Sequence, residues 1–175
     1  MKRIKKLILF LCGHNAGRSQ MAQAFFNELN ENKEFEAESA GTNISTRVNK
    51  ECVEAMKEIG IDLGDTKVYY PKKFNVKKRY YKVYTMGCNV KCSKDADEDL
   101  DLDDPAGKPI EDVRMIRDEL KAKIQKIVEE VKKSVSSSLL TLTCQFLKPT
   151  LVGLSYLKFG PHSCSLALNM PPILY

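Results

Sequence analysis

Near its start the chain reads Leu7-Ile-Leu-Phe-Leu-Cys12-Gly-His-Asn-Ala-Gly-Arg18-Ser19, an apolar run that leads into a loop. The apolar run predicts a buried strand over residues 4–11, because strands covered on both faces carry nearly continuous hydrophobic residues. Apolar residues then recur at helical spacing, which predicts a helix over residues 19–30. The loop between them contains Cys12 and, six positions later, Arg18.

This loop has the composition of an anion-binding site with a nucleophile. Backbone N–H groups of a loop that enters a helix can converge on an anion, and Arg18 can hold two of its oxygens. Their positive field favours the thiolate of Cys12, which would then face the bound anion. The alternative interpretation is a buried cysteine at a strand end, beside an arginine that caps a surface turn.

The other loop residues suit the same function. Gly13 and Gly17 allow a tight turn that aims amide groups inward, and Asn15 tolerates a left-handed backbone. Ser19 can donate a hydrogen bond to the thiolate. His14 lies inside the loop, where we expect it to orient the loop rather than to bind a metal. The predicted oxyanion-binding residues are Gly13, His14, Asn15, Ala16, Gly17, Arg18 and Ser19.

The rest of the chain alternates between strand and helix patterns. Further strands are predicted over residues 36–40 and 80–86, and further helices over residues 49–59 and 108–133. This alternation predicts an α/β fold with a parallel sheet covered on both faces. In such sheets ligands bind beyond the carboxyl ends of the strands, which is where the Cys12 loop falls.

Two of these helices have recognisable ends or faces. Asn49 can cap the shorter helix and Gly60 can stop it. The expected buried face of the shorter helix is Val53, Met56 and Ile59. The expected buried face of the longer helix is Val113, Ile116, Leu120, Ile124, Ile127 and Val131.

A second group of reactive residues, Thr85-Met-Gly-Cys88-Asn-Val-Lys-Cys92, follows the predicted third strand. A parallel sheet would bring it to the same edge as Cys12. The two cysteines could form half of a metal site, but the only histidines, His14 and His162, are not placed as partners. We therefore predict no metal, and we favour a redox pair that relays a disulfide from Cys12.

Asp103-Asp104-Pro105-Ala-Gly107 is a third candidate. A carboxylic acid near the anion site could protonate a leaving oxygen. The spacing alone favours a plain acidic turn, because seven of the ten residues from Asp95 to Asp104 are acidic.

Composition narrows the class of protein. The chain has 175 residues, 43% hydrophobic and 29% charged, as expected for one globular domain, and its net charge is +5. Nine Lys or Arg residues lie between Asp65 and Lys94, without a nucleic-acid-binding signature. We interpret this block as a solvated face that attracts anions, and we predict no nucleic-acid partner.

The first residues are basic, but the apolar run that follows is too short for a secretory signal. We therefore expect a cytoplasmic protein whose six cysteines are reduced thiols rather than structural disulfides. Residues 139–159 are apolar, but Lys148 and Pro149 interrupt them, so no membrane span is predicted.

Together these motifs resemble the thioredoxin-coupled arsenate reductases, which have the low-molecular-weight protein tyrosine phosphatase fold. The residues that carry the resemblance are Leu9-Phe-Leu-Cys12-Gly-His-Asn-Ala-Gly-Arg18-Ser-Gln-Met-Ala, Glu38-Ser-Ala-Gly-Thr42, Thr85-Met-Gly-Cys88, Asp104-Pro-Ala-Gly-Lys-Pro and Ile116-Arg-Asp-Glu-Leu120. The resemblance spans about residues 4 to 133. It implies a four-stranded parallel sheet flanked by helices, in a cytoplasmic enzyme.

The resemblance also implies a role for each catalytic residue. Cys12 would attack arsenate, Arg18 and the loop amides would hold it, and Asp104 would help water to leave. Cys88 would then attack the Cys12–arsenic adduct, which releases arsenite and leaves a Cys12–Cys88 disulfide. Cys92 would attack Cys88, giving a Cys88–Cys92 disulfide for thioredoxin to reduce. No bound cofactor is implied, thioredoxin is the external reductant, and we expect a monomer.

The sequence departs from the family pattern in three places. The family often spaces the relay cysteines further apart and follows the second with proline, whereas here Ser93 follows Cys92 after a short gap. Some members bind potassium through a glutamate where this chain has Gln23, so we do not predict that ion. Phosphatases of this fold often carry a second loop cysteine, and here that position is Gly17.

The composition changes abruptly after Lys133. Residues 134–175 contain no Asp or Glu, only two Lys and four of the seven prolines. We considered an additional packed segment, a membrane-surface or partner contact, and a poorly ordered or non-native appendage, and we favour the last. The predicted organisation is a catalytic domain over residues 1–133 and an atypical tail over residues 134–175. We expect Cys52, Cys144 and Cys164 to be incidental.

Two other functions fit the same loop. A small phosphotyrosine phosphatase would use Cys12, Arg18 and Asp104, with the remaining cysteines as redox protection. A non-catalytic oxyanion-binding or thiol-sensor protein would bind anions without turnover. Arsenate reduction is the function that the cysteine pair favours, because arsenic(V) can take two electrons from two thiols whereas a phosphoryl group cannot.

Overall fold

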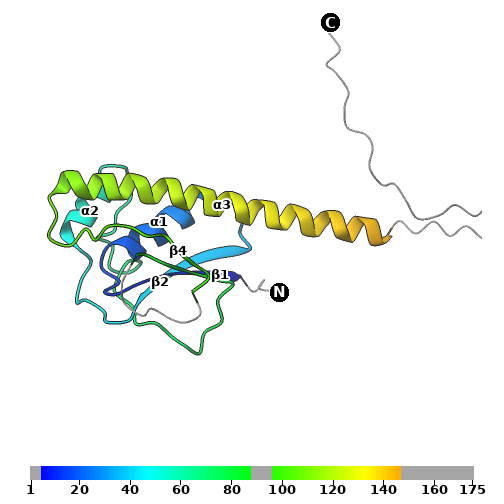
Figure 1. The fold of residues 1–175 in the computed structure, drawn as a ribbon, viewed down its shortest axis with the longest axis horizontal. Helices are drawn as coiled ribbons and strands as arrows, with labels where there is room; N and C mark the ends of the chain where they lie inside the picture. Colours follow the sequence, from blue (N-terminus) through cyan, green and yellow to red (C-terminus); the bar gives the residue numbers. More distant parts are fainter. Residues whose placement is uncertain (1–4, 88–95, 147–175) are drawn as a thin grey trace, which may run out of the picture.

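The computed structural model describes residues 5–87 and 96–146, with side chains as far as residue 134 at the C-terminal end (Figure 1). Its elements, in chain order, are β1 (Lys6–Cys12), α1 (Arg18–Leu29), β2 (Phe35–Gly41), α2 (Lys50–Lys57), β3 (Lys82–Thr85), β4 (Glu98–Asp99) and α3 (Ile110–Phe146). The alternation of strands and helices predicted from the sequence is confirmed.

The four strands form one parallel sheet in the order β2-β1-β3-β4. Cys12 pairs with Gly41 of β2, and Leu11 pairs with Thr85 of β3. The carboxyl ends of these three strands therefore meet at one edge of the sheet. This confirms the predicted fold class, and it places the Cys12 loop at the edge where parallel sheets bind ligands.

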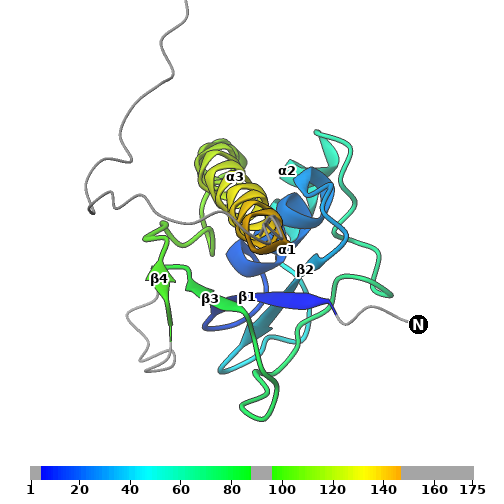
Figure 2. The same cartoon turned by 90° about the vertical axis from the view of Figure 1, so that its right-hand side faces the viewer.

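The main core lies between the sheet and the helices. Its largest fully buried side chains include Phe10, Phe25, Phe26, Tyr84 and Leu120. Figure 2 shows α1, α2 and α3 together on one side of the sheet. Within the described residues, both faces are covered as expected, but the helices lie on one face only.

The opposite face is covered by the connection between α2 and β3. Phe74 and Tyr80 of this connection pack against Leu9, Leu11 and Val83. The connection contains Pro71 and a run of basic residues without a helical apolar pattern, which explains why it crosses the sheet without forming a helix.

Helix α2 begins as predicted but buries a different face. The Asn49 side chain caps it by accepting from the Cys52 N–H at 3.0 Å, and Gly60 follows with φ of +86°. Its buried residues are Cys52, Ala55 and Met56, and the predicted Ile59 is exposed beyond the end of the helix. The predicted apolar face does not include Cys52, whose small side chain packs into the core with Ala55 and Met56.

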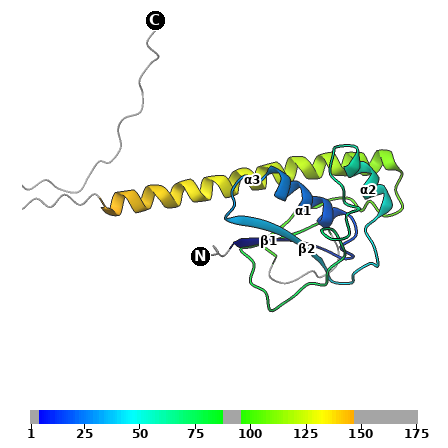
Figure 3. The same ribbon diagram turned by 180° about the vertical axis from the view of Figure 1, so that it is seen from behind.

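Helix α3 buries all of its predicted apolar stripe, from Val113 to Val131. It ends at Phe146, further along the chain than the predicted end near Lys133, and Figure 3 shows it projecting past the sheet. No glycine or proline occurs between Lys133 and Phe146, so no helix-breaking residue stops it there. Among the described helices, none is long and apolar enough to cross a membrane.

Strand β4 was expected only from the family resemblance, because it lies inside the acidic run. Tyr84 of β3 pairs with Glu98, and Leu100 and Leu102 then turn into the core. Two buried leucines among acidic residues are too few to form a strand pattern. The structure nevertheless makes this acidic run the edge of the sheet, and it leads directly to Asp104.

Candidate active site

Cys12 is the last residue of β1, and only 4% of it is exposed. Its Sγ accepts the backbone N–H of Asn15 at 3.1 Å and lies 3.0 Å from Ser19 Oγ. The contact with Ser19 that the sequence suggested is therefore present. One N–H donor and one hydroxyl group thus lie against the sulfur and fix its position beside the loop.

Asn15 has the left-handed backbone expected for it, with φ of +50°. Its Nδ2 donates to Ser19 Oγ at 2.8 Å, and its Oδ1 accepts the backbone N–H of Lys72 at 2.7 Å. The end of β2 lies against Asn15. A Cβ atom added to Gly41 would be 2.9 Å from the backbone nitrogen of Asn15. Only glycine at position 41 lets the loop approach the strand this closely.

The carbonyl groups of the loop point away from its centre. They accept backbone N–H groups from the connection after β2, in the pairs Asn43 to Gly13, Ser45 to His14 and Asn49 to Ala16, at 2.8, 2.9 and 2.6 Å. The C=O and the following N–H of a trans peptide point in opposite directions. The N–H groups of His14, Asn15 and Gly17 are therefore turned to the inner side of the loop, where the N–H of Asn15 donates to Cys12 Sγ.

Arg18 is the first residue of α1 and is 8% exposed. One amino group donates to the carbonyls of Met86 and Leu102 at 2.7 and 2.6 Å, and the other donates to Asp104 Oδ2 at 3.1 Å. Arg18 thus connects the anion loop to the end of β3 and to the segment after β4. Its guanidinium is oriented by these protein groups, with one edge toward the Asp104 side of the site.

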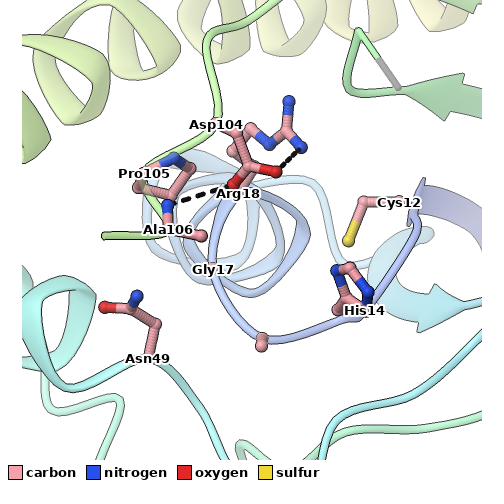
Figure 4. A pocket seen from close by; sticks show the side chains of 9 residues that line it. Cys12, His14, Gly17, Arg18, Asn49, Asp104, Pro105 and Ala106 are labelled. Carbon is pink, nitrogen blue, oxygen red and sulfur yellow. Dashed lines mark hydrogen bonds and ion pairs between the residues drawn. The ribbon is translucent and has the colours of Figure 1, made fainter. Parts of the chain in front are cut away.

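These residues surround a small cavity of about 50 Å³. Figure 4 shows the side chains that line it, among them Cys12, His14 and Asp104. One water molecule needs roughly 10–15 Å³ by the same measure, so the cavity has room for a group of several heavy atoms. Its lining residues are Cys12, His14, Ala16, Gly17, Arg18, Asn49, Asp104, Pro105 and Ala106.

Asp104 is both part of a turn and part of the site. Its Oδ1 accepts the N–H of Ala106 at 3.1 Å, and its Oδ2 faces Arg18. Its side chain is 55% exposed. The neighbouring Asp103 instead pairs with Lys108 at 2.8 Å, and this hydrogen bond lowers the pKa of Asp103. Of the two adjacent aspartates, Asp104 is the one that lines the cavity.

Cys88 and Cys92 lie outside the described residues. The chain approaches them from the edge of the sheet that holds Cys12, since Thr85 pairs with Leu11. Gly87, the last described residue before them, has φ of +72°, and its N–H donates to Asp99 Oδ1 at 2.5 Å.

Cys52 lies unexpectedly close to the anion loop. A Cβ on Gly17 would be 3.2 Å from Cys52 Sγ and 3.1 Å from Pro105 Cγ, so both side chains pack against this glycine. Burial raises the pKa of Cys52 to about 12. Its position three residues after the helix cap Asn49 was the sequence signal that could have placed it here.

Comparison with known proteins agrees with this geometry. Residues 7–86 match the low molecular weight phosphotyrosine protein phosphatase family. The chain is also 34% identical over 131 residues to a putative arsenate reductase of Halobacterium salinarum, covering 69% of this chain and 89% of that protein. The chain belongs to the low molecular weight phosphotyrosine protein phosphatase family. The resemblance seen in its motifs is confirmed.

Two solved structures of arsenate reductases have the same fold as this family member. One, in a phosphate-binding state, has a TM-score of 0.62 and 29% identity, covering 71% of this chain and 98% of that chain. Another, a thioredoxin-dependent arsenate reductase of Corynebacterium glutamicum, has a TM-score of 0.60 and 25% identity, covering 77% of this chain and 65% of that chain. The phosphatase fold thus occurs in enzymes that act on arsenate.

Proposed function

We propose that this protein reduces arsenate to arsenite, with Cys12 as the nucleophile and the Cys88/Cys92 pair as a disulfide relay. The observation that carries the proposal is the sulfur of Cys12, which accepts an N–H and contacts a hydroxyl beside a small cavity that also contains Arg18 and Asp104. The similarity to named arsenate reductases supports the choice of substrate.

The reaction begins when the inward N–H groups of the loop and Arg18 hold the oxyanion over Cys12. The thiolate attacks arsenic and displaces an oxygen, which leaves as water after Asp104 and solvent supply protons. Cys88 then attacks the sulfur of Cys12. The electron pair of the sulfur–arsenic bond stays on arsenic, which becomes arsenite, and a Cys12–Cys88 disulfide forms.

The relay then frees the nucleophile. The thiolate of Cys92 attacks Cys88, which expels Cys12 as a thiolate and leaves a Cys88–Cys92 disulfide. Thioredoxin reduces this disulfide through its own dithiol. In each cycle two electrons pass from the protein thiols to arsenic(V), and thioredoxin returns two electrons. The relay needs free thiols, so we place the enzyme in the reducing environment of the cytoplasm.

The lining of the cavity favours an inorganic oxyanion over phosphotyrosine. Among the residues that form it, His14 has the only ring apart from that of Pro105, and none is Phe, Tyr or Trp. A phosphotyrosine ring would need apolar or aromatic walls beside the anion site. The flanking side chains here are short, namely Ala106 and Asn49, and they offer little surface to an aromatic substrate.

The test is arsenate-dependent NADPH oxidation with thioredoxin and thioredoxin reductase, run beside p-nitrophenyl phosphate hydrolysis. A parallel assay with glutathione and glutaredoxin identifies the reductant. We expect sustained arsenate turnover that is lost in Cys88→Ser and in Cys92→Ser. Steady-state turnover that survives Cys88→Ser would refute the relay.

Two other outcomes would replace the proposal. Phosphatase activity without arsenate reduction would make the protein a phosphatase that uses Cys12, Arg18 and Asp104. Binding of phosphate or arsenate without turnover of either substrate would make it an oxyanion-binding protein.

A further inference from the structure

Gln20 lies between the anion loop and the chain segment that follows α2. It is the third residue of α1 and is fully buried. Its Nε2 is 3.1 Å from the carbonyl oxygen of Asn15, 3.2 Å from Asn15 Oδ1 and 2.9 Å from the carbonyl oxygen of Tyr70. The two hydrogens of one amide group are thus shared among three acceptors, which ties the loop to residue 70.

The same segment also holds Asn15 through its backbone. The N–H of Lys72 donates to Asn15 Oδ1, so this oxygen accepts from Gln20 and from Lys72. With Oδ1 held by two donors, Nδ2 is directed to Ser19 Oγ, which contacts the sulfur of Cys12. A continuous chain of contacts therefore runs from the segment around Tyr70 to the nucleophile.

Asn15 needs this support because of its backbone. A non-glycine residue at φ of +50° is in a conformation that costs energy and persists only where the surroundings impose it. Gln20 contacts both the main chain and the side chain of Asn15. It is therefore placed to fix the backbone of Asn15 and the direction of its amide together.

The oxygen of the Gln20 side-chain amide lacks a hydrogen bond. This atom, Oε1, is buried and has no hydrogen-bond partner among the described residues. A buried polar atom without a partner destabilises the fold, so it calls for an explanation. We therefore explain the amide at this position by the hydrogen bonds that its nitrogen donates to Asn15, and not by a gain in stability.

We propose that Gln20 is a positioning residue for Cys12. By holding Asn15 against the Tyr70–Lys72 segment, Gln20 sets the Asn15–Ser19–Cys12 contacts that position the sulfur for attack. This inference rests on the proposed role of Cys12 as the nucleophile. It concerns the thiol itself, however, and can be measured without arsenate.

The test compares Gln20→Met with Gln23→Met. Gln23 is buried on the same helix, and its Oε1 accepts a hydrogen bond from Ser39 Oγ of β2 at 2.7 Å. Each variant loses one buried amide, so we expect similar decreases in melting temperature. The readout is the rate of Cys12 alkylation by iodoacetamide in the reduced protein, followed by mass spectrometry of the Cys12 peptide.

At pH 6.5 we expect Gln20→Met to be alkylated about three- to tenfold more slowly than wild type, the effect of losing one or two hydrogen bonds. Gln23→Met should react like wild type under the same conditions. If Gln20→Met does not fold, Gln20→Asn is measured instead, since it keeps an amide but is too short to reach Tyr70.

Equal alkylation of Gln20→Met and wild type, or equal slowing in Gln20→Met and Gln23→Met, would overturn the proposal. Arsenate turnover is then measured separately. A failure of arsenate reduction in the wild-type protein would refute the proposed substrate, whereas the alkylation result alone decides the role of Gln20.

Discussion

Cys12 and Cys52 are two buried cysteines next to the anion loop, and their surroundings differ. Cys12 is 4% exposed and Cys52 is 0% exposed, so burial does not distinguish them. The sulfur of Cys12 accepts the N–H of Asn15, contacts Ser19 and lines the cavity. Cys52 packs inside α2, where burial raises its pKa to about 12.

In the function we propose, contacts with polar groups and access to a cavity make the buried thiol of Cys12 reactive, whereas burial without them leaves the thiol of Cys52 inert. Cysteine count and spacing cannot separate these two cases. The difference between the two cysteines comes from the loop around Cys12. The following substitutions test the cysteine, the acidic residue of the cavity and the position of the loop in turn.

The largest expected effect is the loss of all arsenate turnover in Cys12→Ser. A serine hydroxyl cannot form the disulfide through which the two electrons pass, so neither reduction nor the relay can proceed. Cys52→Ala is the matched control and should retain turnover of the same order as wild type. Thioredoxin-coupled NADPH oxidation measures both. A folded Cys52→Ala protein without activity would contradict the contrast between the two cysteines.

The second change tests whether the reactive cysteine also needs the acidic side of its cavity. Asp104→Asn keeps the shape of the side chain but cannot deliver a proton, and we expect arsenate turnover to fall about 10²-fold or more. Single-turnover formation of arsenite measures this step.

Asp103→Asn is the control, because Asp103 is exposed and pairs with Lys108 rather than with Arg18. It should behave like wild type. Equal losses in Asp103→Asn and Asp104→Asn would show that the charge of the turn matters, and not proton delivery by Asp104.

The third change tests the donor that distinguishes Cys12 from Cys52. In Gly41→Ala the new Cβ would come within 2.9 Å of the Asn15 nitrogen and 3.0 Å of the Gly13 carbonyl oxygen. Both are backbone atoms, so the loop must move, and the Asn15 N–H moves relative to the sulfur. We expect kcat/KM to fall between about ten- and a hundredfold, as small misplacements of catalytic groups do.

Gly60→Ala provides the matched control. Gly60 has a positive φ, and no other atom lies near the position of its missing Cβ. This variant should lose stability through backbone strain without any loss of kcat/KM. A Gly41→Ala protein with unchanged kcat/KM would show that the loop tolerates displacement.

The sequence was sufficient to predict those elements that depend on residues close to one another in the chain. The apolar run of β1, the apolar stripe of α3 and the capping residue Asn49 each act through neighbours in sequence, and all three were predicted correctly. Within the anion loop, the left-handed Asn15 and the Ser19 contact also follow from residue type and spacing.

What the sequence could not predict depends on contacts between distant segments. Arg18 donates to carbonyls of Met86 and Leu102, and nothing in the local pattern of any of these residues indicates the others. Gln20 and Tyr70 meet for the same reason, because the connection after α2 returns to the loop. The packing of Cys52 against Gly17 likewise requires the position of α2 relative to the sheet.

The smallest expected effect concerns the inert member of the pair, Cys52. Burial, the largest cause, raises its pKa from 9.0 to about 12. A thiol with a raised pKa in the folded state stabilises the fold fully below the unfolded value, and this stability is lost as pH rises from about 9 toward 12. Within that window, each pH unit costs at most about 1.4 kcal/mol of unfolding free energy.

Melting temperatures of wild type and Cys52→Ala between pH 8 and 10.5 measure this loss. The wild type should lose stability more steeply above pH 9 than Cys52→Ala, although the variant is the less stable protein at pH 8 because of its cavity. Tyr69, Tyr80 and Tyr84 also have pKa values raised mainly by burial, but they are present in both proteins and cancel in the difference. Parallel curves would mean that Cys52 ionises in the folded protein as easily as in the unfolded chain, and its description as an inert thiol would then be wrong.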